Sequence, residues 1–357
     1  MLGRLRRCLE PGLRWALVCI YAGATACVPG ALRGVQKCPD LAHASQSANA
    51  PSLVASLHPH TTPNKSTPEV RISSRVPAIE PFGLTFSLPM DFLMQSSTLE
   101  LGSGSECGQL TGPSSAACLG SVVWPQRLTS LVFDSNMPVN KASWPASLHR
   151  LSFGTAFNWP IAEVVWPSSL QQLSFGVNFN HSIANVEWPA SLKRLSFGSA
   201  FNWPIAEVVW PASLQQLSFG SRFNQIITKV MWPAFLQQLS FGSRFNQPID
   251  GTVWPTSLQQ LSFGGEFDHP IAKVVWPASL QQLSFGNKFN QPIAGVVWPA
   301  SLRQLLFGRE FNQPIVGVVW PAFLQQLSFG RNFRQPIVGV VWPATLRSVT
   351  RGGFRLL

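Results

Sequence analysis

The 357-residue sequence is poor in the residue types from which active sites are built. Charged residues make up 11% of the chain, tyrosine occurs once and there are six histidines, whereas soluble domains average about 25% charged residues. The three histidines beyond residue 120 stand singly, and Glu163 and Glu207 are copies of one repeat position. Catalysis needs a nucleophile beside a base or a pair of carboxylates. The sequence therefore predicts no enzyme, no catalytic residue and no cofactor.

Cysteine is absent after residue 118. The six cysteines are Cys8, Cys19, Cys27, Cys38, Cys107 and Cys118. Neither a Cys-x-x-Cys pair nor the Cys/His spacing of a zinc site occurs. No metal site is predicted.

Tryptophan and phenylalanine are abundant, with 14 and 25 copies, and they mark an internal repeat. A Trp-Pro pair recurs with a first gap of 20 residues and later gaps of 22. The repeat consensus is WPASLQQLSFGxxFNQPIAxVV. The tryptophans of these pairs are Trp124, Trp144, Trp166, Trp188, Trp210, Trp232, Trp254, Trp276, Trp298, Trp320 and Trp342. A constant period of this length is typical of stacked repeat proteins.

Each repeat is expected to form one coil of a solenoid. The alternation at Leu217, Ser218 and Phe219 is that of a short half-buried strand, with Leu217 and Phe219 pointing inward. Gly220 then permits a positive φ or a tight bend, and two prolines per repeat exclude a long helix. One coil cannot bury its own core, so stability must come from stacking. The predicted fold is mainly β: a solenoid of about eleven 22-residue coils with one short parallel strand per coil, preceded by a largely disordered leader.

The stretch LSFGxxFNQPI, as in residues 239–249, strongly resembles the FNIP repeat, a leucine-rich-repeat-like unit. The resemblance covers residues 124–354, about two thirds of the chain. Its Phe-Asn-x-Pro-Ile motif is intact at residues 157–161, 201–205, 245–249, 289–293 and 311–315. Some copies differ, because Ser182 and Ile226 replace the proline and Asp268 and Arg334 replace the asparagine. The resemblance implies a repeat scaffold with a role in protein–protein interaction.

The asparagine of the motif is predicted to form a ladder, with each side-chain amide satisfying backbone groups at a turn buried between coils. The ladder residues are Asn158, Asn180, Asn202, Asn224, Asn246, Asn290 and Asn312. Asp268 can accept a hydrogen bond but cannot donate one, so a local adjustment is expected there.

Two groups of residues are candidate partner-binding sites. Trp159, His181 and Trp203 follow the asparagine on three successive coils and would form an aromatic strip, which is typical of binding anchors. The alternative is that each tryptophan packs on the proline after it. Arg222 and Arg244 belong to a column whose charges alternate farther along the chain, which indicates either a solvated charge ladder or a site for an acidic partner.

The sequence before the repeats divides into three segments. In residues 1–40, four arginines up to Arg14 precede an apolar run that ends in Ala24-Thr25-Ala26, the pattern of a secretory signal peptide. An uncleaved anchor or a transit peptide is the alternative, and membrane contact is predicted only through an uncleaved leader. Residues 41–80 are a Ser/Pro/Thr-rich linker that we expect to be disordered, residues 81–120 are a candidate N-terminal cap, and residues 121–357 form the solenoid.

The leader also decides the expected location and the state of the cysteines. If residues 1–26 are removed, the protein enters the secretory pathway or leaves the cell, and a Cys107–Cys118 disulfide is then plausible. Otherwise the chain resides in an organelle or the cytoplasm, with free thiols as the alternative.

Charge is uneven along the chain. Residues 121–357 hold 17 Lys/Arg and 8 Asp/Glu, a difference of +9, and seven arginines but one carboxylate follow residue 302. The leading prediction is a monomeric, non-catalytic scaffold with a protein partner. The alternatives are a structural or cell-surface protein without a discrete ligand, and a nucleic-acid binder that uses the C-terminal arginines. The second is disfavoured because basic and aromatic residues do not interleave along one face.

Overall fold

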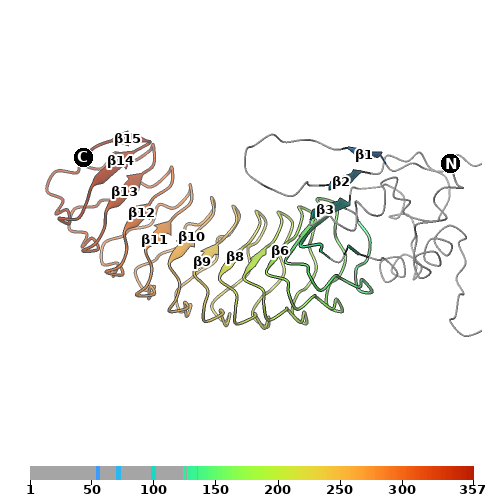
Figure 1. The fold of residues 1–357 in the computed structure, drawn as a ribbon. Coiled ribbons are helices and arrows are strands. Elements are labelled where there is room, and N and C mark those ends of the chain that lie inside the picture. The colour runs from blue at the N-terminus through green and yellow to red at the C-terminus, as the bar shows by residue number, and fades with distance from the viewer. Residues whose placement is uncertain (1–53, 57–69, 74–97, 102–123, 126, 135) are drawn as a thin grey trace, which may run out of the picture.

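The computed structural model describes residues 54–56, 70–73, 98–101, 124–125, 127–134 and 136–357. Its strands form a single sheet in chain order, and the coils stack into an arc (Figure 1). The strands are β1 (Val54–Ser56), β2 (Val70–Ser73), β3 (Thr98–Leu101), β4 (Ser130–Phe133), β5 (Arg150–Phe153), β6 (Gln172–Ser174), β7 (Arg194–Ser196), β8 (Gln216–Ser218), β9 (Gln238–Ser240), β10 (Gln260–Ser262), β11 (Gln282–Ser284), β12 (Gln304–Leu306), β13 (Gln326–Phe329), β14 (Ser348–Arg351) and β15 (Phe354–Arg355).

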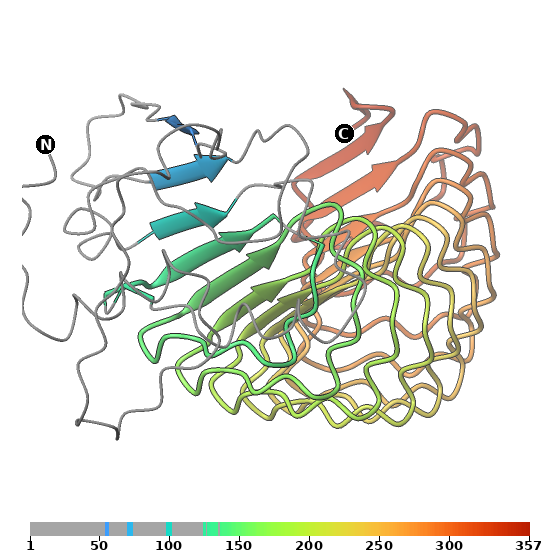
Figure 2. The ribbon, with the colours of Figure 1, turned by 90° about the vertical axis from the view of Figure 1, so that its right-hand side faces the viewer.

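The predicted solenoid is confirmed. Strands β4 to β14 pair in parallel with each residue opposite its equivalent in the next repeat, as Leu217 is opposite Leu239. A view along the array shows the strands one behind another on one side and the loops on the other (Figure 2). No helix occurs in the described part of the chain, because the prolines and the short segments between turns leave no room for one.

Both ends of the parallel sheet carry an antiparallel strand. β1 pairs with β2 in antiparallel fashion at the N-terminal end, and β15 pairs with β14 at the C-terminal end. At the C-terminal end the reversal is made by Gly352 and Gly353, whose φ values are 57° and 90°. Arg351, which stands where earlier coils have phenylalanine, pairs with Phe354. A short, charged final strand protects a sheet edge from pairing with other chains.

Three strands lie before the repeats. β1 and β2 fall within residues 41–80, which we expected to be a disordered linker, and β3 falls within the candidate cap at residues 81–120. β2 pairs with β3 and β3 with β4 in parallel, so the sheet continues past the first Trp-Pro pair. The remainder of both segments, the leader at residues 1–40 and the Cys107–Cys118 pair lie outside the described residues. The domain boundaries and the disulfide therefore stay predictions.

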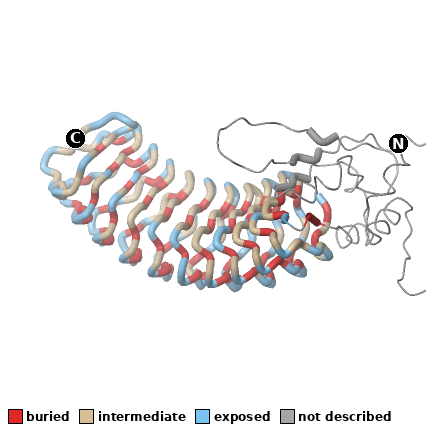
Figure 3. Tube along the Cα trace, in the orientation of Figure 1, coloured by how far each residue is buried: buried red, intermediate tan, exposed pale blue. Residues whose placement is uncertain are grey.

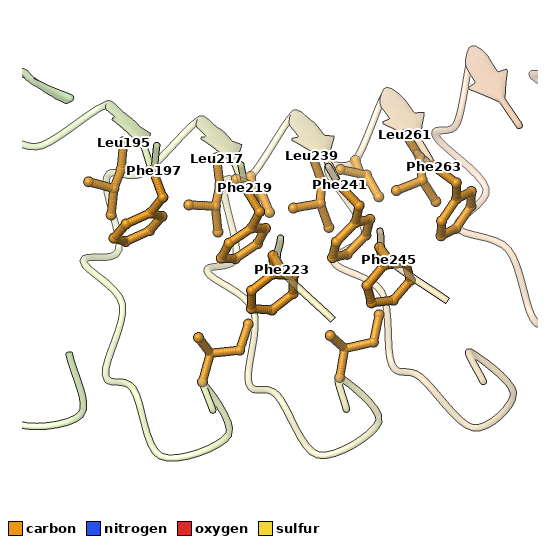
Figure 4. Close-up of a cluster of buried hydrophobic side chains, with 14 of the residues drawn as sticks. Leu195, Phe197, Leu217, Phe219, Phe223, Leu239, Phe241, Phe245, Leu261 and Phe263 are labelled. Carbon is orange, nitrogen blue, oxygen red and sulfur yellow. The ribbon is translucent and has the colours of Figure 1, made fainter. Parts of the chain in front are cut away.

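The core consists of equivalent apolar side chains stacked from coil to coil, which appear as regular buried bands in Figure 3. Leu217 and Phe219 point inward from the strand, and Phe223 adds a second ring beneath Phe219 (Figure 4). The ring centroids of Phe219 and Phe223 are 4.1 Å apart within a coil, and those of Phe219 and Phe241 are 5.7 Å apart between coils. Offset stacking at these distances is favourable for aromatic rings.

The glycine after each strand serves close packing between coils. We allowed Gly220 a positive φ, but it is not among the glycines that adopt one. A Cβ built on Gly220 would overlap the carbonyl oxygen of Gly198 in the preceding coil and lie 2.8 Å from the Ser199 nitrogen. Glycine is therefore required at this corner because neighbouring backbones approach too closely for any side chain.

Candidate interaction surfaces

Each coil presents four surfaces, which we name by their residues in one typical repeat. The sheet face carries the outward side chains of Gln215, Gln216 and Ser218. The asparagine flank is residues 221–226, the back turn is residues 227–229, and the tryptophan flank is residues 230–235. The equivalent residues of every other coil belong to the same surfaces.

The sheet face is a continuous lattice of polar side chains above a shallow groove. Glutamine and serine recur at the outward positions from coil to coil, and a groove of about 700 Å³ runs along residues of β4 to β12. Some serine hydroxyls bond to each other along the row, with 2.7 Å between the Oγ atoms of Ser174 and Ser152. The framework beneath is rigid because these strands are paired on both sides.

Most departures from the polar consensus on the sheet face bring positive charge, while Leu306 places an exposed apolar side chain in the serine row. Arg150 and Arg194 replace the strand glutamine two coils apart, and Lys193, Arg303 and Arg347 replace the glutamine before the strand. From His149 to Thr350, no coil has a carboxylate at the two glutamine positions or at the outward serine position of the sheet face. Our sequence analysis missed Arg150 and Arg194, although each stands out against the glutamine consensus.

The asparagine flank contains a hydrogen-bonded ladder. The Oδ1 atom of each motif asparagine accepts the backbone N–H of the equivalent residue in the next coil; in the example of Asn224 and Asn246 the distance is 2.9 Å. The same bond joins the other coils of the row at 2.7–3.1 Å. We expected these side chains at a turn buried between coils, but they are exposed or half-buried. The ladder runs along the surface because the phenylalanine before each asparagine occupies the interior.

The prediction of an adjustment at Asp268 is wrong. The Asp268 N–H donates to Asn246 Oδ1 at 3.0 Å, and Asp268 Oδ1 accepts the Asn290 N–H at 2.9 Å. The link from coil to coil needs only an acceptor on the side chain, and a carboxylate provides one as well as an amide does. The donor capacity that aspartate lacks is not used in this link.

Two side chains of the candidate aromatic strip contact the backbone of the asparagine ladder. Trp203 Nε1 donates to the Asn180 carbonyl at 2.9 Å, and His181 Nε2 lies 2.9 Å from the Asn158 carbonyl. In later coils a glutamine amide occupies this place, as Gln225 does against Asn202. Trp159 is half-buried against the core, while Trp203 is 41% exposed. These positions therefore have a structural use, and partner binding through them stays a proposal.

Arg222 and Arg244 are exposed on successive coils of the asparagine flank. Farther along their column Lys288 forms an ion pair with Glu266. The hydrogen bond to Glu266 and its charge raise the pKa of Lys288 above the ordinary 10.5, and Glu310 on the next coil adds to the effect. The later part of the column is thus locally neutralised, whereas Arg222 and Arg244 form a small positive patch.

The tryptophan flank bears a row of exposed apolar side chains that our sequence analysis did not identify. Of each Val-Val pair the first lies inward and the second is exposed, as Val208 at 4% and Val209 at 77% show; only Val340 of the last pair is half-buried. The exposed members are 77–83% accessible and are Val165, Val209, Met231, Val253, Val275, Val297, Val319 and Val341. The sequence did contain a signal for this row: in an extended segment neighbouring side chains point to opposite sides, so one valine of each pair before the tryptophan must face outward.

The C-terminal arginines are spread over several surfaces. Arg303 and Arg347 adjoin the sheet face, while Arg309 and Arg331 lie on the asparagine flank. Arg334 donates to the Arg331 and Phe333 carbonyls. Arg355 donates to those of Leu357 and Arg347 and so ties down the last strand.

The described residues contain no helix long and apolar enough to cross a membrane. They also contain no cluster of three or more His, Cys, Asp or Glu side chains able to hold a metal ion.

Comparison with known proteins identifies the repeat. The FNIP Repeat family matches residues 179–222, 223–266, 245–288, 267–310 and 289–322. No curated protein matches the chain. Among solved structures, an internalin from Listeria monocytogenes is similar over 78% of this chain and 86% of its own, with 15% identity and a TM-score of 0.44. A leucine-rich repeat protein from Bacteroides ovatus is similar over 87% and 93%, with 12% identity and a TM-score of 0.18.

The family assignment rests on the repeat match. The coils before and after residues 179–322 keep the same strand register and the same stacked phenylalanines. Residues 179–322 of the chain are therefore FNIP repeats.

Proposed function

We propose that the protein is a non-catalytic scaffold that binds another protein on its sheet face. The observation that carries this is the sheet face itself, a continuous groove whose outward side chains are polar except for Leu306, held on strands paired on both sides. Stacked repeats typically bind partners on such extended surfaces. A rigid surface loses little conformational entropy on binding, which favours affinity.

The charges on this surface indicate the chemistry of the partner. Arg150, Lys193 and Arg194 lie toward one end of the groove and Arg303 and Arg347 toward the other, with uncharged glutamine and serine columns between them. The sheet columns from His149 to Thr350 offer no carboxylate to pair with a cation. A partner with acidic residues would meet complementary potential, which speeds association and suppresses wrong partners.

Site-specific photo-crosslinking in the native cell tests the proposal. A photoreactive residue at Ser218 or Ser262 reports on the sheet face, one at Arg222 on the asparagine flank, and one at Ala272 on the back turn. We expect one discrete protein adduct from the sheet positions, weakened when Arg150 and Arg194 are changed to glutamate. An adduct from Arg222 alone would move the site to the flank that contains Trp203 and Arg244.

The same experiment separates the alternatives. A structural protein without a discrete ligand would give no adduct from any surface. A nucleic-acid binder would give an adduct that nuclease removes, and its binding would fall steeply with salt.

A further inference from the structure

The tryptophan flank changes character along the array. In the early coils its exposed valines stand among carboxylates, since Glu163 and Glu207 occupy the back turns and Glu187 replaces one member of the valine row. From Val274 to Val341 the flank and its turns contain no carboxylate. The same framework thus carries an acidic surface at one end and an apolar one at the other.

Extra apolar side chains widen the row in the last coils. Val316 and Val338 are exposed in the back turns, at 53% and 86%, beside Val319 and Val341 of the row. Exposed alanines lie next to the row at Ala300, Ala322 and Ala344. We name the exposed apolar surface of residues 294–344 on this flank the valine patch.

Phe323 adds an exposed aromatic ring to the patch, as Phe235 does at the same position of an earlier coil outside the patch. Most coils have a serine or threonine there, whose hydroxyl donates to a leucine carbonyl of the preceding coil, as Ser301 and Thr345 do at 2.7 and 2.8 Å. Phe323 cannot make this bond and stands 59% exposed instead. A single exposed ring is common, but Phe323 lies among the exposed valines and alanines of the patch, and a contiguous apolar surface with an aromatic ring is typical of a binding surface.

The last position of each back turn in the patch is a glycine and carries no side chain. Gly295, Gly317 and Gly339 have φ values of 78–83°, and a Cβ built on any of them would have nothing within 4 Å. The equivalent positions of the early coils carry Glu163, Asn185, Glu207 and Lys229. Without side chains there, a flat surface can reach the backbone of the turn and the valines beside it together.

Positive charge borders the patch. Arg303 and Arg347 are exposed at its edge toward the sheet face, two coils apart, with Gln325 between them. Two copies of the chain docked through this patch would bring these arginines toward each other, which opposes self-association. Apolar side chains bordered by arginine, with no carboxylate, are the combination that holds a protein at an anionic membrane surface.

We propose that the valine patch docks on the surface of a bilayer that contains anionic lipids. Val319, Val341 and Phe323 enter the boundary between headgroups and acyl chains, and Arg303 and Arg347 contact lipid phosphates and carboxylates. This contact goes beyond protein binding by the sheet face and shares only Arg303 and Arg347 with that face.

Vesicle co-sedimentation of the full chain tests the proposal. The probes are vesicles of phosphatidylcholine alone and of phosphatidylcholine with phosphatidylserine. Binding is expected only with phosphatidylserine. It should weaken between about 0.1 M and 1 M salt, as the screening length falls from about 10 Å to about 3 Å. Equal binding to both vesicles, or none to either, would overturn the proposal.

Matched variants separate the patch from the basic leader at residues 1–40. Val319→Glu with Phe323→Glu should weaken vesicle binding roughly tenfold or more. Val165→Glu with Val209→Glu, in the same row of the early coils, should leave it unchanged. Both variants change exposed side chains, so their thermal unfolding should match that of the parent. Binding that survives the first variant would assign it to another part of the chain and overturn the proposal.

Sedimentation velocity excludes a second copy as the occupant. A dimer that Val319→Glu dissociates, and that strengthens with salt because the arginines repel, would overturn the bilayer proposal. These results are independent of the photo-crosslinks from Ser218, so either proposal can fail alone.

Discussion

The glycine that follows each strand and the glycine in the later back turns lie in the same coils but in different surroundings. A Cβ on Gly220 would overlap backbone of the preceding coil, whereas a Cβ on Gly317 would meet nothing within 4 Å. Gly317 is instead required by its φ of 80°, which L side chains rarely adopt. One row of glycines is constrained by the stack, the other by its own backbone.

This contrast shows where the repeat can vary. Positions that face the neighbouring coil are held by contacts repeated along the whole array, so a change there disturbs a shared interface. The last position of each back turn faces solvent, and it carries glutamate, asparagine, lysine or glycine in different coils. Differences in surface character between the two ends of the protein can accumulate there at little cost in stability.

Gly220→Ala is expected to have the largest effect. Its Cβ would force two backbones apart, and overpacking of this kind costs about 3 kcal/mol or more. Urea unfolding followed by tryptophan fluorescence should show a lower midpoint and separate transitions for the coils on either side. A midpoint equal to that of the parent would mean that the coils can shift apart easily.

A change in the asparagine ladder should have an intermediate effect. Asn224→Leu removes the acceptor of the Asn246 N–H and of the Gln247 amide, at a cost of about 1–2 kcal/mol. Asn224→Asp keeps an acceptor, as Asp268 does naturally, and should stay near the stability of the parent. Equal losses in both variants would show that the ladder depends on the amide as a donor.

Gly317→Ala should cost about 1 kcal/mol, because alanine is strained at this φ but has ample space. Gly317→Asn should cost less, since asparagine tolerates the left-handed region better. Thermal unfolding of the two variants checks the order. A loss as large as that of Gly220→Ala would contradict the open surroundings of this turn.

The smallest effect is expected at the Lys288–Glu266 ion pair, whose side chains are 51% and 44% exposed. Exposed pairs contribute little and are screened by salt. The pKa of Lys288 is raised in the folded state, so its contribution is present below pH 10.5 and disappears as the pH rises through the raised value. Lys288→Gln should lower the melting temperature slightly at pH 7 and low salt. The difference from the parent should vanish at high salt, or once the pH has risen past the raised pKa of Lys288.

Much of the fold follows from the sequence pattern, and less of the surface does. Leu217 and Phe219 could be assigned inward from their alternation, and the Trp-Pro period correctly indicated one coil per repeat. The reason for Gly220 could not be found this way, because the overlap involves a residue 22 positions earlier. The role of Asp268 was wrongly predicted for a similar reason. Whether the ladder side chain donates or accepts in the link between coils depends on how two coils face each other, and the sequence of one coil does not show this.

The sequence by itself determined the repeat period, the strand in each coil and the absence of a long helix, because these depend on the order of residues within one 22-residue unit. Only the tertiary structure decided which surfaces are available for binding. How much of each exposed valine remains accessible, and whether a turn has open space around it, depends on how far each coil covers the next. That coverage arises only when the coils stack, because a single coil has no neighbour to bury its faces.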